Sequence, residues 1–420
     1  MKRISKTFPL NNIESFKIKM LNWVKPFNIF SFLDHNHYSF EKPAFDVILA
    51  AGSYKSIELN QSELFLKLKE FSQNNNDWLF GHLNYPSEKK DKIDFPTAYF
   101  FIPQYLIEMH DYQVSIASID KSPDEIYAEI ENQDESVSKT IFSQIQIKNK
   151  ISQDEYYDKL NEIKNNIQRG DCYEINFCQE FYSENTLIDP FFLFNQLNQY
   201  SPNPFAAFYK LNDKFCFCAS PERFIKKSGN EIISQPIKGT SKRNLVHAEK
   251  DADLKSQLLN SPKEKSENVM IVDLVRNDMS KICKEGSVNV KELFGIYTFP
   301  QVHQMISTIR GEVDDQTHWT EIVDACFPMG SMTGAPKKRV MELIEKYESG
   351  PRGLFSGSIG YITPDFDFDF NVVIRSVFYN STTQYLSFKA GGGITNLSDL
   401  EEEYKESCLK VEAIIKVLNT

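Results

Sequence analysis

The segment from Gln235 to Thr240 reads Gln-Pro-Ile-Lys-Gly-Thr and places Lys238 at the end of an extended run, between a proline and a glycine. An amine attacks carbon only when it is neutral, and a desolvated pocket lowers the pKa of a lysine toward that state. We therefore expect Lys238 to act as a nucleophile if it is buried. A solvated surface lysine is the alternative, and the surrounding residues must decide between the two.

Two Glu-x-x-Glu pairs could hold a metal ion, Glu264 with Glu267 and Glu403 with Glu406. A spacing of three aligns both side chains of a pair on one face of a helix. In the last segment, apolar residues recur at helical spacing over 400–418 and put the second pair at the flank of the apolar stripe. If the two helices converge, four carboxylates meet, and oxygen ligands of this kind suit Mg²⁺. Solvated glutamates on exposed faces are the alternative.

Other residues could hold a carboxylate-bearing substrate. The run Gly391–Gly393 leaves backbone N–H groups accessible, and Arg375 supplies a guanidinium fork. His303 is either a core histidine or an acid and hydrogen-bond donor. The glycine-rich segments have neither the spacing of a phosphate-binding loop nor that of a dinucleotide fingerprint, so we do not expect nucleotide binding.

Two hairpins should position Lys238. The runs 205–211 and 215–219, and then 222–227 and 231–238, are rich in β-formers and separated by short polar turns. A three-residue turn centred on Gly229 would set Glu222 opposite Pro236, with Lys238 on the same face. Diagonal neighbours of that kind lie about 7 to 8 Å apart. A carboxylate and an amine would then flank one small molecule.

A helix should precede the hairpins. Ser152 and Glu155 form a capping-box pattern, and Gly170 is a stop signal. Apolar side chains recur at helical spacing between them, at Tyr156, Leu160, Ile163 and Ile167. Together with the hairpins, this helix predicts an α+β fold in which an antiparallel sheet carries Lys238.

The 420 residues carry a formal net charge of −11, which argues against a nucleic-acid surface. We expect an N-terminal subdomain over 1–120, a linker or exposed helix over 121–140 and a catalytic domain over 141–420. The basic start lacks a continuous apolar stretch, so we expect no signal peptide. The seven cysteines are odd in number and contain no C-x-x-C pair, which favours reduced thiols and a cytoplasmic location.

From about residue 151 to 416 the chain resembles the chorismate-utilising enzymes, which include component I of anthranilate synthase and the isochorismate synthases. Seven segments in the family's order carry the resemblance: Gly170–Asn176, Ser220–Phe224, Pro236–Thr240, Glu267–Asp278, Gly330–Lys337, Ile374–Ser376 and Ala390–Ile394. The resemblance implies an anthranilate-synthase-component-I-like α/β sandwich, with two large antiparallel sheets and outer helices.

The resemblance also assigns roles to particular residues. It implies that Lys238 adds to C2 of chorismate while Glu222, as general acid, helps the C4 hydroxyl to leave. Arg375, Gly392 and Gly393 would hold substrate carboxylate. Further family positions near the substrate are Thr240 and His303, and also Phe355, where the family commonly has tyrosine. The implied ligands of Mg²⁺ are Glu264, Glu267, Glu403 and Glu406.

One position separates the branches of the family. Enzymes that form anthranilate usually have alanine where this chain has Lys238, whereas the branch that aminates C4 has lysine. Water-adding enzymes carry a different lysine, at the position that the resemblance assigns to Gln179, so water addition is disfavoured. Glutamate at 174 replaces a commoner glutamine, with no consequence that the sequence alone provides.

The resemblance therefore implies amination of chorismate to 4-amino-4-deoxychorismate, on the route to p-aminobenzoate and folate. The chain has no nucleophile-elbow cysteine with a downstream His-x-Glu, so we expect ammonia to come from a separate glutamine amidotransferase subunit. Two alternatives stay open. One is anthranilate synthesis, and the other is a non-catalytic subunit that only binds chorismate.

Overall fold

The computed structural model describes residues 3–38, 45–60, 63–136 and 145–419. The strands are β1 (Ile4–Pro9), β2 (Ile29–Asp34), β3 (Val47–Leu59), β4 (Leu79–Leu83), β5 (Ala98–His110), β6 (Gln113–Ser118), β7 (Lys148–Asn149), β8 (Glu174–Ser183), β9 (Phe205–Leu211), β10 (Lys214–Ser220), β11 (Arg223–Ser228), β12 (Glu231–Gln235), β13 (Ile237–Lys242), β14 (Asn289–Thr298), β15 (Val302–Glu312), β16 (Gly334–Ala335), β17 (Ser358–Ile362), β18 (Phe368–Asn371), β19 (Ser376–Asn380) and β20 (Tyr385–Ile394). The helices are α1 (Ile13–Trp23), α2 (Leu64–Asn74), α3 (Pro123–Glu131), α4 (Gln153–Gln168), α5 (Pro190–Tyr200), α6 (Ala248–Asn260), α7 (Pro262–Ser280), α8 (Trp319–Cys326), α9 (Lys337–Tyr347) and α10 (Leu400–Leu418), with a 3₁₀ turn, η1 (Gly330–Met332).

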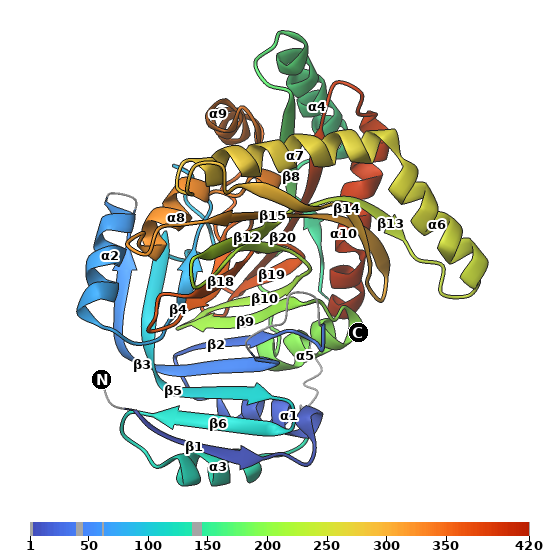
Figure 1. The fold of residues 1–420 in the computed structure, drawn as a ribbon. Helices are drawn as coiled ribbons and strands as arrows, with labels where there is room; N and C mark the ends of the chain where they lie inside the picture. The colour runs from blue at the N-terminus through green and yellow to red at the C-terminus, as the bar shows by residue number, and fades with distance from the viewer. Residues whose placement is uncertain (1–2, 39–44, 61–62, 137–144, 420) are drawn as a thin grey trace.

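Two antiparallel sheets share the long strands β3 and β5 (Figure 1). The first sheet runs β1-β6-β5-β3-β2-β9-β10-β19-β20-β8. The second leaves β5 through β4 and continues β17-β18-β11-β12-β15, with β13 and β14 both on β15. The pairing of β3 with β5 shifts register between Ser53 and Lys55, and such a bulge bends a strand. The expected α+β architecture with two large antiparallel sheets is confirmed.

The largest apolar cluster lies between the two sheets. It joins Phe100 of β5 and Phe370 of β18 to Cys178 of β8 and Cys218 of β10. A second cluster covers the other face of the first sheet, where Phe191 of α5 and other helical residues pack on it. Both faces of the central strands are therefore buried, and β2, β9 and β10 are buried along nearly their whole length. Toward the edge, β6 alternates between buried and less buried positions and β1 is mostly exposed.

The first 120 residues do not form sheets of their own. Strand β2 pairs with β9, and β4 pairs with β17. Within 121–140, expected to be a linker or an exposed helix, residues Pro123–Glu131 form α3, whose Ile126 and Ile130 are buried. Positions 137–140 of that stretch lie outside the described residues. Strand pairs of both sheets therefore join residues on either side of the boundary expected near residue 120.

The predicted capped helix is present as α4. Ser152 and Glu155 form the reciprocal capping box, and Gly170 follows the helix at a φ of +84°. The carboxylate pairs lie on helices too, Glu264 and Glu267 on α7 and Glu403 and Glu406 on α10. The buried face of α10 is rotated from the expected one, because it includes Glu403 and Ser407. The buried Glu403 lies near the start of α10, which indicates that this end of the helix faces a polar site.

Both predicted hairpins are present, but each turn is one residue shorter than expected. Leu211 pairs with Lys214 in the first hairpin and Ser228 pairs with Glu231 in the second, which leaves two-residue turns. The register then shifts along β11, so that Arg223 pairs with Gln235. This bulge compensates for the shorter turn and brings the chain before Arg223 beside the start of β13.

All seven cysteines are free thiols, as the sequence predicts. Among the described residues, no helix combines the length and the apolar character that crossing a bilayer would need.

Candidate active site

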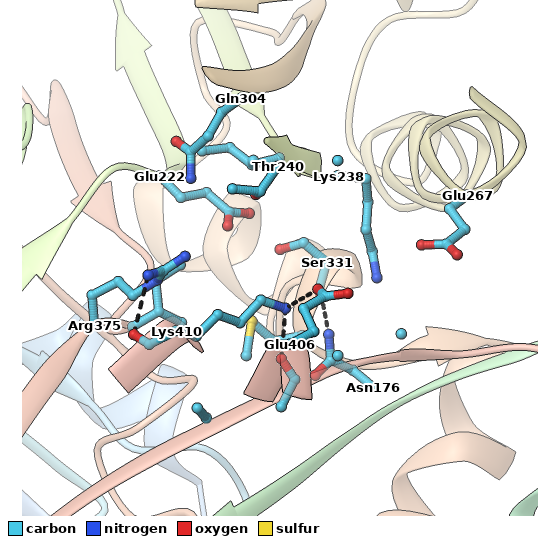
Figure 2. Close-up of a pocket in the computed structure, with 18 of the residues that line it drawn as sticks. Asn176, Glu222, Lys238, Thr240, Glu267, Gln304, Ser331, Arg375, Glu406 and Lys410 are labelled. Carbon is cyan, nitrogen blue, oxygen red and sulfur yellow. Dashed lines mark hydrogen bonds and ion pairs between the residues drawn. The ribbon is translucent and has the colours of Figure 1, made fainter. Parts of the chain in front are cut away.

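A cavity of about 110 Å³ opens where the ends of both sheets meet α7 and α10 (Figure 2). Its walls come from segments that are far apart in the sequence, and Lys238, Glu222, Glu267 and Arg375 point into the same space. The lining residues include Asn176, Pro221, Glu222, Lys238, Thr240, Lys263, Glu264, Glu267, Gln304, Ser331, Phe355, Arg375, Gly391, Gly392, Gly393, Glu403, Glu406 and Lys410. Cationic and anionic side chains thus surround one small, largely polar space, in which several polar groups converge as they do in small-molecule sites.

Lys238 extends from β13 into the cavity and is 9% exposed. Its Nζ lies 2.6 Å from Glu174 Oε1, and Glu174 is 1% exposed. Burial opposes the charged amine, but the carboxylates of Glu174 and Glu267 outweigh burial and raise the pKa of Lys238. The expectation of a lowered pKa was therefore wrong for the resting site, because the sequence did not reveal the buried carboxylate behind the lysine.

Glu222 lies just before β11 and is 3% exposed. The Ser331 hydroxyl and the Ile237 backbone N–H favour the charged form of its carboxyl group. Burial nevertheless raises the pKa of Glu222 to about 7, because these polar groups and the charge of Lys238 only partly offset the cost of a buried anion. A carboxyl group with this pKa carries a proton about half the time near neutrality, which suits a general acid.

The three glycines of β20 form the floor between these groups and α10. A Cβ on Gly393 would lie 2.5 Å from both Glu174 Oε1 and Lys238 Nζ. A Cβ on Gly392 would lie 3.0 Å from Glu403 Oε2. Glycine is therefore needed here for close approach of charged side chains to the backbone.

The four glutamates expected to bind metal all line the cavity. Burial, with the charge of Glu174 and Glu264 beside it, raises the pKa of Glu267 to about 7. Burial and the charge of Glu406 likewise raise the pKa values of Glu264 and Glu403. Mutual repulsion of this kind is relieved when a cation binds between the carboxylates.

Lysines neutralise part of this charge in the structure. Lys410 Nζ lies 2.7 Å from Glu406 Oε1, and Lys263 Nζ lies 3.5 Å from Glu403 Oε1. Lys410 lowers the pKa of Glu406. Within the part of the chain that the structure describes, no three His, Cys, Asp or Glu side chains are grouped closely enough to hold a metal ion.

The donor set nevertheless fits a hard cation. All four side chains offer oxygen, and the buried Glu267 Oε1 has no hydrogen-bond partner among the residues that the structure describes. A buried carboxylate oxygen without a partner is costly, and a cation would remove that cost. Because the carboxylates do not converge, binding of a cation would require their side chains to reorient.

Arg375 lies across the cavity from Glu267 (Figure 2). Its backbone is left-handed, with a φ of +53°. Burial lowers the pKa of its guanidinium to about 10, and Glu406 partly offsets that effect. Its Nη1 donates to the backbone oxygen of Lys410 at 3.1 Å. Phe355 and Thr240 also line the cavity. The remaining guanidinium donors can bind an anionic group.

The structure does not bring His303 or Gln179 into the cavity. His303 lies on β15 next to Gln304, and neighbouring residues of a strand face opposite sides. Gln304 faces the cavity, whereas the ring nitrogens of His303 lie 3.0 Å from Thr298 Oγ1 and 3.1 Å from Asp251 Oδ1. Gln179 instead donates to Ser407 Oγ at 2.7 Å.

Sequence reasoning missed several of the charged residues around the site, namely Glu174, Lys263 and Lys410. Two of these are lysines on helices, a pattern that is usual for solvated faces, so no local signal distinguishes them. Glu174 lay within a motif that was recognised, and its departure from the commoner glutamine was the available signal.

Comparisons with known proteins identify the family of this chain. The profile of the family described as "chorismate binding enzyme" matches residues 31–416. The chain belongs to this family of chorismate-binding enzymes. Its cavity at the ends of the two sheets is therefore the candidate chorismate site, and the residues carried over from the resemblance converge there with the exceptions of His303 and Gln179.

Among similar chorismate-binding enzymes are two named aminodeoxychorismate synthase component 1. The protein of that name from Klebsiella aerogenes is 36% identical over 343 residues, which cover 81% of this chain and 74% of the relative. The one from Escherichia coli is 39% identical over 268 residues, which cover 64% of this chain and 58% of the relative.

Solved structures share the fold. The menaquinone-specific isochorismate synthase of Escherichia coli has a TM-score of 0.79 at 15% identity, over 100% of this chain and 94% of that one. Anthranilate synthase component I of Streptococcus pneumoniae has a TM-score of 0.74 at 21% identity, over 99% and 93% of the two chains. At these identities the likeness concerns the fold alone.

Proposed function

We propose that this chain aminates chorismate at C4 to give 4-amino-4-deoxychorismate, with Lys238 as a covalent nucleophile and Glu222 as general acid. The observation that carries the proposal is that Lys238 and Glu222 line one cavity, in a chorismate-binding family whose similar members are named aminodeoxychorismate synthase component 1. A nucleophile and a proton donor on one small cavity can act on the same ring.

In the first step the Lys238 nitrogen forms a bond to C2 of the ring. The two ring double bonds shift, and the C4–O bond breaks as the Glu222 proton leaves with the hydroxyl as water. A Glu222 pKa of about 7 supports this role, because a protonated carboxyl is present near neutral pH.

In the second step ammonia attacks C4, the double bonds shift back, and the Lys238 amine leaves from C2. We propose that a glutamine amidotransferase subunit supplies the ammonia, which is in keeping with the name component 1 of the relatives. Folate precursor synthesis and a cytoplasmic location belong to the same proposal, the latter in keeping with seven free thiols.

The substrate carboxylates would be held by Arg375 and by the backbone N–H groups of Gly392 and Gly393. We propose that Glu264, Glu267, Glu403 and Glu406 hold Mg²⁺, which when bound supplies positive charge for the ring carboxylate. The repulsion among these carboxylates and the unpartnered Glu267 oxygen support a cation at this place.

The proposal is tested with purified protein, chorismate, Mg²⁺ and an ammonium salt, with products identified by liquid chromatography and mass spectrometry. We expect 4-amino-4-deoxychorismate, formed with ammonium but not with glutamine alone. Fluorescent anthranilate as the main product would contradict the proposal and favour anthranilate synthesis. No turnover with either nitrogen source would favour a subunit that only binds chorismate.

The covalent step is tested with Lys238→Ala, for which we expect a loss of about 1000-fold in kcat at saturating ammonium. Lys242→Ala is the matched control, because Lys242 lies on the same strand but pairs with Glu412 at the surface. Unchanged turnover of the Lys238 variant would remove the covalent mechanism, while the product assay would still report on the enzyme class.

A further inference from the structure

Lys238 and Glu174 form a buried ion pair at the edge of the cavity. Glu174 Oε1 accepts a hydrogen bond from Lys238 Nζ at 2.6 Å, and Glu174 Oε2 is buried without a partner among the described residues. Glu174 stands at the start of β8 and does not line the cavity, whereas Lys238 does. The amine nitrogen therefore has the cavity on one side and a carboxylate on the other.

This arrangement raises a chemical problem for the proposed nucleophile. The charged form of Lys238 is favoured in the resting site, and a protonated amine has no electron pair with which to attack. The proton must first move to an acceptor within hydrogen-bond reach. Glu222 cannot serve, because it must itself carry a proton for the leaving hydroxyl.

The other charged groups around Lys238 are directed toward different partners. From α7, Glu267 and Glu264 are expected to bind the cation, and from α10 Glu406 is paired with Lys410. Glu174 is the residue in contact with Nζ, and it is held in place by its position on β8 and by the absence of a side chain on Gly393.

We propose that Glu174 is the catalytic base that accepts the proton of Lys238, an inference that rests on the proposed covalent function. Before attack, the proton passes from Nζ to Glu174, leaving a neutral amine and a neutral carboxyl group. The amine then forms the N–C2 bond and the nitrogen carries the positive charge of the adduct. When ammonia has attacked C4, the C2–N bond breaks, the amine leaves neutral, and Glu174 returns its proton.

If Glu174 accepts the proton of Lys238, the pH dependence of adduct formation should show it. Transfer within the pair takes up no proton from solvent and releases none, so adduct formation by the unmodified protein should not depend on the Lys238 pKa. In Glu174→Gln the proton must instead leave to solvent. Below about pH 7, where Glu222 is protonated, the rate of adduct formation by this variant should fall about tenfold per pH unit.

The experiment mixes protein with chorismate and saturating Mg²⁺ but no ammonia, quenches with acid at timed intervals, and measures adduct by intact mass between about pH 5.5 and 7. We expect a flat profile for the unmodified protein and a steep one for Glu174→Gln. Glu174→Asp keeps a carboxylate and should keep the flat profile at a lower rate. Glu184→Gln, one residue beyond the same strand, is the matched control and should match the unmodified protein, because the Glu184 carboxylate is exposed and pairs with Lys92 at the surface.

The outcomes separate the two proposals. A flat profile for Glu174→Gln, with no adduct on Lys238→Ala, would overturn the role of Glu174 and leave the covalent mechanism standing. A steep profile for Glu174→Asp would overturn it as well, because the carboxylate would then confer nothing. Absence of any adduct on the unmodified protein would overturn the covalent function itself and the inference with it.

Discussion

Lys238 Nζ lies so close to Gly393 that a methyl group on the glycine would be 2.5 Å from the amine nitrogen. The substitution Gly393→Ala should therefore push the lysine out of position and lower kcat by about 100-fold, the usual cost of an ångström-scale misplacement. The clash involves side-chain ends, so the melting temperature should change little. Steady-state kinetics and thermal denaturation measure the two effects.

The control for this prediction is Gly391→Ala on the same strand. A Cβ there would lie 1.9 Å from the backbone oxygen of Phe177, and backbone cannot move aside as a side chain can. We expect this variant to lose stability rather than only activity. Full activity of Gly393→Ala would contradict the placement of Lys238.

Activity should follow the protonation of Glu222. Because its pKa is about 7 and the protonated form is required, kcat should fall about tenfold per pH unit above that value. Glu222→Gln cannot donate a proton, so it should be nearly inactive across the whole range. A rate that rises from pH 7 to 9 in the unmodified protein would show that Glu222 is not the acid.

The raised pKa of Glu222 also makes folding depend on pH. The folded state binds a proton that the unfolded state has released between about pH 4.5 and 7, so the free energy of unfolding falls as pH rises through this window. The total loss is up to about 3 kcal/mol for this buried group. Urea denaturation at pH 5 and pH 8 should show a smaller difference for Glu222→Gln than for the unmodified protein.

Mg²⁺ should stabilise the protein, and more strongly at pH 8 than at pH 6. The pKa of Glu267 is about 7, so at the lower pH a proton competes with the cation for this carboxylate. At a concentration 100 times its Kd, a bound ion adds about 2.7 kcal/mol to the free energy of unfolding. Differential scanning fluorimetry with and without Mg²⁺ measures the shift.

Glu267→Gln should abolish most of that Mg²⁺ effect. Glu402→Gln is the matched control, because Glu402 is exposed on α10 beside the carboxylates that face the cavity. An equal shift for the Glu267 variant and the unmodified protein would place the cation elsewhere.

A buried ion pair should anchor the wall of the cavity that carries Asn176. Arg352 pairs with Glu348 at 2.7 Å and donates to the backbone oxygens of Asn176 and Met332. Removing one partner leaves a buried charge, so Glu348→Gln should lower the free energy of unfolding by about 3 to 5 kcal/mol in urea denaturation. The exposed pair of Arg339 with Glu342 is the control, and Glu342→Gln should change stability little.

The sequence predicted the elements whose signals are local. The capping box of α4 and the hairpins around Lys238 follow from residues within a few positions of one another. The shared cavity of Lys238 and Glu222 was predicted as well, although the turn was wrong, because a bulge in β11 restored the register. A bulge depends on tertiary packing and has no reliable sequence signal.

The rest depended on contacts between distant segments. Glu174 meets Lys238, 64 residues away in the chain, only because β8 and β13 both begin beside the same cavity. The charge state of Lys238 follows from that contact, so the sequence expectation about its pKa failed. His303 and Gln304 differ only in which face of β15 they occupy, and a shift of one residue in the register decides it.

The strands β3 and β5 belong to both sheets, so the two halves of the molecule are not separable bodies. A truncation that removed the first 120 residues would strip β9 and β17 of their neighbours and leave two open edges flanking the apolar interior. Such edges recruit other chains. None of the described residues before 120 lines the candidate chorismate cavity, so their contribution is to cover, through β2 and β4, two strand edges that would otherwise be open to other chains.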